Sequence, residues 1–400
     1  MTSQFLQHKL PLLLISIAVL LLTGCWDRKE VNDLGLVTAA GIDKISNKTI
    51  ELSALVYIPK SVGGQQSMNG GSGGGSAQTL VRSATGVTVA DAMSKLQQKL
   101  PRHIFWGHTA VFIFDEKLAK MGLAKHVDFI LRHPQLRERS EIFITKQKAR
   151  KVLGVLPPLE RDLSTVLREL ESMKMGMEVT AKNFAEMLLS DSGDTAVPYI
   201  KMLPPEEGRK KKETIAYITG TAIFKKDKMV GIIDASVTRG VLWLRNEIQL
   251  ATVTVQPKEA KGYVSLSLLE ATTELIPKIE HGKWKMVFKA DADADVIQNT
   301  TKLDMANPKV IKSLQQQLEK EIEAKVKLAL VQVQKDMKAD VFGFGDAFHR
   351  KYPGLWKKNK DRWDNIFPNV EVTIHSNMKI RRHGMNSVIS SIFLNKVNEK

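Results

Sequence analysis

The sequence predicts a mixed α/β region followed by a region of antiparallel strands with one long amphipathic helix. Three observations support this prediction. Strand-like and helix-like segments alternate between Gly35 and Leu189, which is typical of α/β or α+β domains. Beyond Lys212 the segments become strand-like and are joined by hairpin signals. From Pro308 to Val341, apolar residues then recur at helical spacing.

The chain opens with a short apolar segment that ends at a cysteine. The apolar residues run from Leu10 to Leu22, whereas a helix that spans a membrane needs roughly 20 of them. Cys25 is the only cysteine in 400 residues, and the small residues Thr23 and Gly24 precede it. A buried structural cysteine would explain neither the spacing nor the absence of other thiols. We therefore expect residues 1–24 to be a lipoprotein signal peptide and Cys25 to be the lipidation site.

Acylation of Cys25 would determine much about the mature chain. Diacylglyceryl and N-acyl chains such as palmitate together give durable membrane anchoring, which a single chain does not. Removal of the leader takes away Lys9, so that the net charge falls from +16 to +15. No thiol would remain for a disulfide. For an exported protein, this basic charge favours anionic lipid or acidic wall polymer as a partner over nucleic acid.

The first region is predicted to contain four strands and four helices. The strands are Gly35–Asp43, Glu51–Ile58, His108–Phe114 and Ser140–Thr145. The helices are Thr88–Leu100, with Thr88 as its cap, Leu118–Leu131, Leu159–Met173 and Thr180–Leu189. Residues 63–78 are rich in glycine, serine, glutamine and asparagine, which predicts a flexible loop. This tract is no phosphate-binding loop, because no Gly-Lys-Ser/Thr follows its glycines.

A domain boundary is predicted where prolines, a glycine and four consecutive cations interrupt the pattern, from Met202 to Lys212. We expect an N-terminal α/β domain at residues 25–205. A C-terminal α+β region should follow at residues 206–385, with a possible subdivision near residue 250. Residues 386–400 would form a tail.

The second region is predicted to be a sheet covered by a long helix. Its strands are Gly220–Phe224, Met229–Asp234, Val264–Leu268, Trp284–Ala290 and a closing strand at Val370–Ile374 that continues toward Ile380. The helix runs from Pro308 to Val341. Its apolar stripe consists of Val310, Leu314, Leu318, Ile322, Val326, Leu330, Val333 and Met337. We expect this helix to pack on an antiparallel sheet.

Two groups of potential metal ligands do not match known sites. The histidines His103, His108, His126 and His133 fit no zinc spacing, so surface or structural roles are favoured. Asp291, Asp293 and Asp295 begin like a calcium loop, but the sixth position is Val296 and the twelfth is Lys302. We instead expect these aspartates on the wet face of a strand that runs to the sheet edge.

Catalysis has no support in the sequence. There is no Gly-x-Ser-x-Gly motif for a nucleophile, and the only thiol is assigned to lipid. Glu169 and Glu171 would face apart on a helix. Arg132, Arg137 and Arg139 are able to clamp an acidic ligand, although solvated cations at a helix end are the simpler reading. Neither a cofactor, a metal nor an enzymatic activity is expected.

Several motifs resemble the Ger(x)C family, the C-subunit lipoproteins of bacterial spore germinant receptors. The first is Gly24-Cys25-Trp26-Asp27-Arg28-Lys29-Glu30, which continues to Gly41-Ile42-Asp43. The others are His108–Phe114, Gly122-Leu123, Asp128–Arg132, Gly220–Lys225, Met229–Gly231, Thr238-Arg239-Gly240, Asp340–Gly345, Trp363, Phe367-Pro368 and Gly384. The resemblance covers nearly all of the mature chain.

The resemblance implies a non-enzymatic subunit that acts with A and B subunits at the spore inner membrane in nutrient-triggered germination. It implies α/β domains outside that membrane, and offers no catalytic residues. The 63–78 tract departs from the family as an expanded loop. Two alternatives stay open. A solute-binding lipoprotein of a transporter would have two similar doubly wound lobes, and a wall hydrolase would need an acid/base pair or a metal set.

Overall fold

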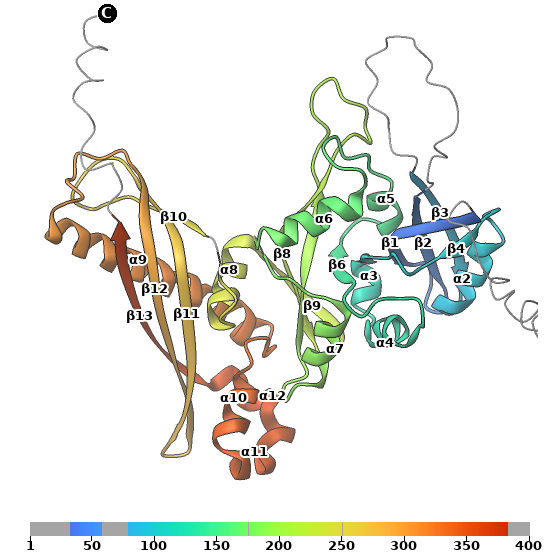
Figure 1. The fold of residues 1–400 in the computed structure, drawn as a ribbon. Helices are drawn as coiled ribbons and strands as arrows, with labels where there is room; N and C mark the ends of the chain where they lie inside the picture. The colour runs from blue at the N-terminus through green and yellow to red at the C-terminus, as the bar shows by residue number, and fades with distance from the viewer. Residues whose placement is uncertain (1–32, 58–78, 175, 250, 383–400) are drawn as a thin grey trace, which may run out of the picture.

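Two β-sheets form the framework of the protein, one toward each end of an elongated molecule (Figure 1). The computed structural model describes residues 33–57, 79–174, 176–249 and 251–382. Nine strands in the first part of the chain make up the larger sheet, and four later strands make up the smaller one. Helix α8 (Ala235–Leu244) lies between the two sheets (Figure 1).

The nine-stranded sheet has the order β3-β2-β1-β5-β6-β7-β8-β9, and β4 pairs with the start of β1. Strands β1, β5, β6 and β7 run parallel at its centre, and antiparallel strands flank them. The strands are β1 (Leu34–Lys44), β2 (Ile50–Tyr57), β3 (Thr79–Gly86), β4 (His103–Phe105), β5 (Val111–Asp115), β6 (Glu141–Thr145), β7 (Thr195–Met202), β8 (Ala216–Lys225) and β9 (Lys228–Asp234).

Helices cover both faces of this sheet, as its parallel centre requires. On one face, α5 and α6 pack through apolar residues such as Val152, Leu163 and Leu167. On the other face lie α2, α3, α4 and α7. Their bounds are α2 (Val89–Gln97), α3 (Glu116–Ala119), α4 (Ala124–Arg132), α5 (Ala149–Leu153), α6 (Leu163–Ser172) and α7 (Ala181–Leu189).

The four-stranded sheet has the order β10-β11-β12-β13 and carries one long helix on its inner face. Its strands are β10 (Thr252–Val255), β11 (Val264–Glu280), β12 (Lys283–Asn299) and β13 (Glu371–Arg382). The helix is α9 (Pro308–Ala329), which continues without a break as the π-helical η2 (Leu330–Asp336). Small helices then follow: α10 (Phe344–Lys351), α11 (Pro353–Asn359), η3 (Lys360–Arg362), α12 (Trp363–Ile366) and η4 (Phe367–Asn369).

The predicted fold class is confirmed. The α2 cap also forms as expected, because the Thr88 side chain accepts a hydrogen bond from the Asp91 amide. The long helix buries Leu314, Leu318 and Ile322 of its predicted stripe. The aspartates of β12 lie on the solvated face of their strand, which is internal because it lies between β11 and β13. The prediction that this strand reaches the sheet edge is therefore wrong.

Three further predictions need correction. A single helix at Leu118–Leu131 is wrong, because Gly122 adopts φ +120 and separates α3 from α4. A fully antiparallel second sheet is also wrong, because β13 pairs in parallel with β12. The long helix ends at Asp336 rather than at Val341. There Lys338 turns left-handed at φ 54 and frees Asp340 to bind backbone amides.

The predicted domain boundary at residues 205/206 falls in the loop between β7 and β8. Both strands belong to the nine-stranded sheet and pair with each other in antiparallel register. Residues 216–234 therefore complete the first sheet instead of beginning the second. The division of the chain into domains that fold separately at this loop stays a prediction.

Candidate functional site

The residue predicted to carry lipid, Cys25, lies outside the described residues, as does the predicted loop 63–78. Its acylation stays a prediction. Within residues 33–57, 79–174, 176–249 and 251–382, no helix has both the length and the apolar character needed to cross a bilayer.

The four histidines are dispersed over different environments. His126 is buried in α4, and burial lowers its pKa to about 4. His133 ends the same helix and lies against Phe129, with ring centroids 5.4 Å apart. His108 faces a cavity, and His103 begins β4. Among the described residues, no group of three or more histidine, cysteine or carboxylate side chains is arranged to hold a metal.

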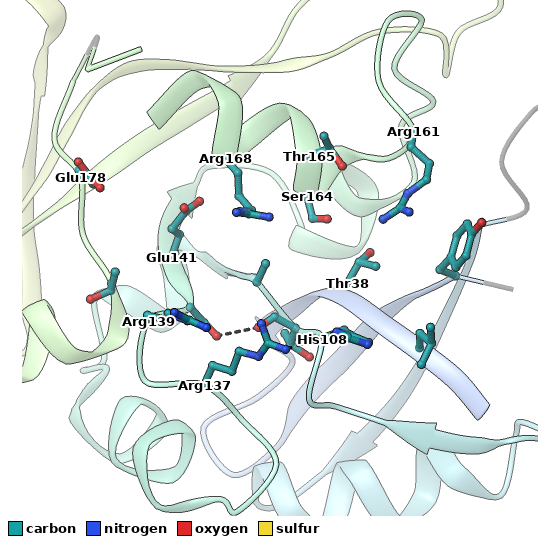
Figure 2. Close-up of a pocket in the computed structure, with 16 residues that line it drawn as sticks. Thr38, His108, Arg137, Arg139, Glu141, Arg161, Ser164, Thr165, Arg168 and Glu178 are labelled. Atoms are coloured by element: carbon teal, nitrogen blue, oxygen red, sulfur yellow. Dashed lines mark hydrogen bonds between the residues drawn. The ribbon is translucent and has the colours of Figure 1, made fainter. Parts of the chain in front are cut away.

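A cavity of about 690 Å³ opens where the parallel strands of the large sheet begin (Figure 2). Its walls come from the first residues of β1 and β6, the loop before β5, and the segments around α6. This volume lies within the usual range of small-molecule sites. The site therefore combines elements that are distant in sequence.

Four arginines line the cavity, and in Figure 2 they reach toward it from two sides. Arg137 and Arg139 precede β6, whereas Arg161 and Arg168 belong to the start and the middle of the α6 segment. Arg161 is held over the Tyr57 ring, with its guanidinium carbon 4.7 Å from the ring centroid. Neither Arg139 nor Arg168 makes a hydrogen bond or an ion pair with another described residue.

A β-bulge places Thr38 at the wall of the cavity. The register of β1 against β2 shifts between Val37 and Ala39, so that Thr38 has no partner across the ladder. Its side chain is 7% exposed, and Oγ1 has no hydrogen-bond partner among the described residues. A bulge of this kind redirects a side chain. A buried hydroxyl without a protein partner is costly, so Thr38 is able to bond to a water molecule or to another group in the cavity.

The carboxylates near the cavity offset only part of the charge of its arginines. Asp162 pairs with Arg161 at 3.6 Å, and the charge of Arg168 acts on Glu141. Glu178 is engaged by Lys174 in an ion pair. Glu141 is half-buried, and burial raises its pKa well above the usual value. Glu171 on α6 faces it from below the cavity; burial first, and then the charge of Glu141, raise the pKa of this carboxyl too. The cavity consequently keeps a positive charge.

A second polar feature joins the two sheets. Asp194, just before β7, accepts hydrogen bonds from Lys225 Nζ at 3.1 Å and from the Asp340 amide at 2.7 Å. Asp340 is fully buried and accepts from the Gly345 amide at 2.8 Å and from Trp363 Nε1 at 3.0 Å. Burial raises the pKa of Asp340 to about 6. This network connects the large sheet to the helices that follow η2.

Sequence reasoning identified part of the cavity. Two of the three arginines that it considered, Arg137 and Arg139, line the cavity, whereas Arg132 pairs with Asp128 on the outer surface of α4. It missed Arg161 and Arg168, since they lie more than twenty residues away along the chain. Their only signal was a spacing of seven residues, which would place them on one face of the predicted helix Leu159–Met173, whereas Arg161 lies just before the N-cap of α6.

Two family models match the chain over most of its length. The model "Spore germination protein N-terminal domain" matches residues 27–202, and "Spore germination B3/ GerAC like, C-terminal" matches residues 219–384. The chain belongs to the GerAC family of spore germination proteins. As a GerAC-family protein it is a relative of germinant receptor C subunits.

Curated relatives and a solved structure agree with this assignment. Spore germination protein KC of Bacillus subtilis (strain 168) is 27% identical over 389 residues, which cover 93% of this chain and 95% of the relative. The putative spore germination protein YfkR of that organism is 28% identical over 376 residues, 94% of this chain and 96% of the relative. The crystal structure of the GerBC protein has the same fold, with a TM-score of 0.55 and 20% sequence identity. That likeness covers 86% of this GerAC-family chain and 96% of the GerBC chain.

Proposed function

We propose that this chain is the lipid-anchored C subunit of a nutrient germinant receptor in the spore inner membrane. Acylated Cys25 would tether it to the outer face of that membrane, beside an A and a B subunit. It would take part in complex assembly and signal coupling and would carry out no catalysis. The observation that carries this proposal is the match of both family models, which together reach from residue 27 to residue 384.

The architecture supports a role in assembly. Two extended sheets, with a junction where Lys225 pairs with the buried carboxylate of Asp194, offer large surfaces, which suits a subunit that holds partners in place. The solute-binding alternative predicted two similar doubly wound lobes. The two sheets instead differ in size and topology, and the cationic cavity opens where the central strands of one sheet begin. No observation favours that alternative.

The anchor is tested by replacing Cys25 with serine in sporulating cells. We expect Cys25→Ser to remove the protein from the spore inner membrane, to abolish its copurification with the A and B subunits, and to slow nutrient-triggered germination. Immunoblots of spore fractions and the loss of optical density after nutrient addition measure these effects. A second strain carries Cys25→Ser behind an uncleaved transmembrane helix.

Recovery of germination in that second strain would support tethering as the purpose of the lipid. Wild-type protein found equally in the membranes of growing cells would contradict the proposal. A Cys25→Ser protein that keeps its place in the membrane would contradict the anchor alone.

A further inference from the structure

We propose that the cavity lined by Arg137, Arg139, Arg161 and Arg168 binds the phosphate group of an anionic ligand. The ligand is either a free phosphorylated small molecule or the headgroup of a phospholipid. Neither family membership nor the assembly role requires such a site. The proposal therefore goes beyond the function argued above and stands or falls separately.

The charge of the cavity selects an anion. Four guanidinium groups line it, and guanidinium stays protonated at every physiological pH. The Lys174 ammonium group already pairs with Glu178. Arg161 pairs with Asp162 at 3.6 Å, and the charge of Arg168 acts on Glu141 without a direct hydrogen bond. Arg139 has neither a hydrogen bond nor an ion pair among the described residues. Arginines that share one concave site repel each other. A bound anion relieves that repulsion and gains charge-assisted hydrogen bonds.

The number of donors favours phosphate over a carboxylate. One arginine fork satisfies both oxygens of a carboxylate and balances its single charge. A phosphate group offers more acceptor oxygens and up to two charges, which suits several arginines together with a hydroxyl. His108 adds a further polar group, because its Nδ1 lies 3.5 Å from Arg137 Nη2.

The cavity is preorganised for binding. The bulge in β1 holds the hydroxyl of Thr38 at the wall without a partner, although the side chain is more than nine-tenths buried. Stacking on Tyr57 restricts Arg161 before any ligand arrives. Thr38, Arg161 and His108 all line the cavity, and Figure 2 shows the three side chains in the same part of its wall. Such preorganisation lowers the entropy that binding costs.

The position of the cavity makes a lipid headgroup a reasonable source of the phosphate. Leu36 near the start of β1 and Tyr57 at the end of β2 belong to its lining. Leu36 follows Cys25 by eleven positions, and a fully extended chain of that length reaches about 40 Å. If Cys25 is acylated as proposed, the Leu36 side of the cavity stays within that distance of the membrane surface.

The test measures binding to the full-length protein in a detergent with uncharged headgroups. Isothermal titration calorimetry is run with three soluble probes: glycerol 1-phosphate, monomeric dihexanoyl phosphatidylglycerol, and succinate as the carboxylate comparison. We expect at least one phosphate probe to bind and succinate to bind more weakly. Binding of glycerol 1-phosphate alone would indicate a free metabolite, and binding of the lipid alone would indicate a headgroup.

Matched variants assign the binding to the cavity. We expect Arg139→Gln/Arg168→Gln to weaken the phosphate probe about tenfold or more, since hydrogen bonds to charged groups are lost. Thr38→Val keeps the shape of the side chain but removes the hydroxyl, and should weaken binding about fivefold. The control Arg82→Gln/Arg132→Gln removes the same charge from exposed positions outside the cavity and should change nothing.

Three results would overturn the proposal: no binding of either phosphate probe, tighter binding of succinate than of both phosphate probes, or equal weakening in the cavity and control variants. The arginine variants change exposed side chains, and Thr38→Val replaces a hydroxyl group with a methyl group of similar size. Thermal unfolding of each variant checks that the fold is intact.

Discussion

Some single residues in this protein occupy environments that their side chains ordinarily avoid, and the carboxyl pair of Glu171 and Glu141 beside the cavity shows this best. Glu171 is 3% exposed on α6, and one of its oxygens has no hydrogen-bond partner among the described residues. Its only amide donor is Val179, at 3.4 Å. Glu141 faces it from β6, and burial raises the pKa of Glu141 as well, though less than that of Glu171. Burial of two carboxyls in one place favours their protonated forms.

The stability of the protein should therefore depend on pH through this pair. At about pH 4 the carboxyl of Glu171 is protonated in both the folded and the unfolded chain. As pH rises above the ordinary value, the unfolded chain ionises while the folded chain resists, so the free energy of unfolding falls. Glu171→Gln removes this loss. We expect it to gain on the order of 2 kcal/mol relative to wild type between about pH 5 and pH 8.

Thermal unfolding, followed by circular dichroism at about pH 4 and at about pH 8, measures this gain in the free energy of unfolding. Glu169→Gln on the same helix is the matched control, because Glu169 is exposed and is not a member of the carboxyl pair. A difference between Glu171→Gln and wild type that is the same at both pH values would show that the pair does not titrate as described.

At the scale of elements, glycines set how closely helices and strands approach. Gly240 in α8 lies against the backbone of α9, where an added Cβ would come within 2.1 Å of the Lys325 carbonyl oxygen and 2.9 Å of Ala329 Cβ. The crossing of α8 and α9 is the main helix contact between the two sheets. A side chain at Gly240 would push these helices apart.

Gly240→Ala should lower the free energy of unfolding by about 2–3 kcal/mol, as overpacking of a close backbone contact typically does. The control is Gly354→Ala in α11, where an added Cβ meets no atom within 4 Å. That change should be neutral or slightly stabilising, because alanine is the better helix former. Urea unfolding of both variants compares them. Equal stability would mean that the α8–α9 crossing tolerates a wider spacing.

At the scale of the molecule, one hydrophobic core extends through both sheets. Its buried residues run from Val37 in β1 through Val241 in α8 to Ile380 in β13. The polar junction lies at the edge of this core. Lys225 Nζ reaches the Asp194 carboxylate on one side, and the Lys338 carbonyl oxygen at 2.8 Å and Asp364 at 2.5 Å on the other. The two sheets should therefore unfold together.

We expect Lys225→Met to weaken the coupling between the unfolding of the two sheets. It leaves the buried carboxylate of Asp194 without its cation, which we expect to cost about 2–3 kcal/mol. Four of the tryptophans, Trp243, Trp284, Trp356 and Trp363, lie in α8, the second sheet and the small helices, so tryptophan fluorescence reports chiefly that part of the chain. Trp356 and Trp363 pack at the junction with ring centroids 5.0 Å apart, and circular dichroism reports the whole chain. We expect the two signals to coincide in wild type and to separate in the variant.

Lys228→Met on the same hairpin is the control, since Lys228 is exposed. If the two signals of Lys225→Met coincide, and if its unfolding midpoint equals that of Lys228→Met, the junction does not couple the sheets.

Local patterns in the sequence were enough to predict the fold class, the positions of most elements, the apolar stripe of α9 and the family resemblance. Period and capping depend on neighbouring residues, so Thr88 and Leu314 could be assigned from the sequence alone. The lipid at Cys25 was predicted in the same way and awaits its experiment.

Tertiary structure decided the rest, because it depends on contacts between distant segments. Gly122 breaks a helix where Asp227 of the β8–β9 turn approaches it, with Oδ2 2.5 Å from an added Cβ. β13 pairs in parallel with β12 only because the chain returns to this sheet after the 71 residues 300–370. The cavity combines arginines that precede β6 in the chain with arginines that follow it. It also depends on the bulge at Thr38, which local sequence patterns do not predict. Sequence fixes what each segment can form, whereas the packing of segments determines which side chains meet.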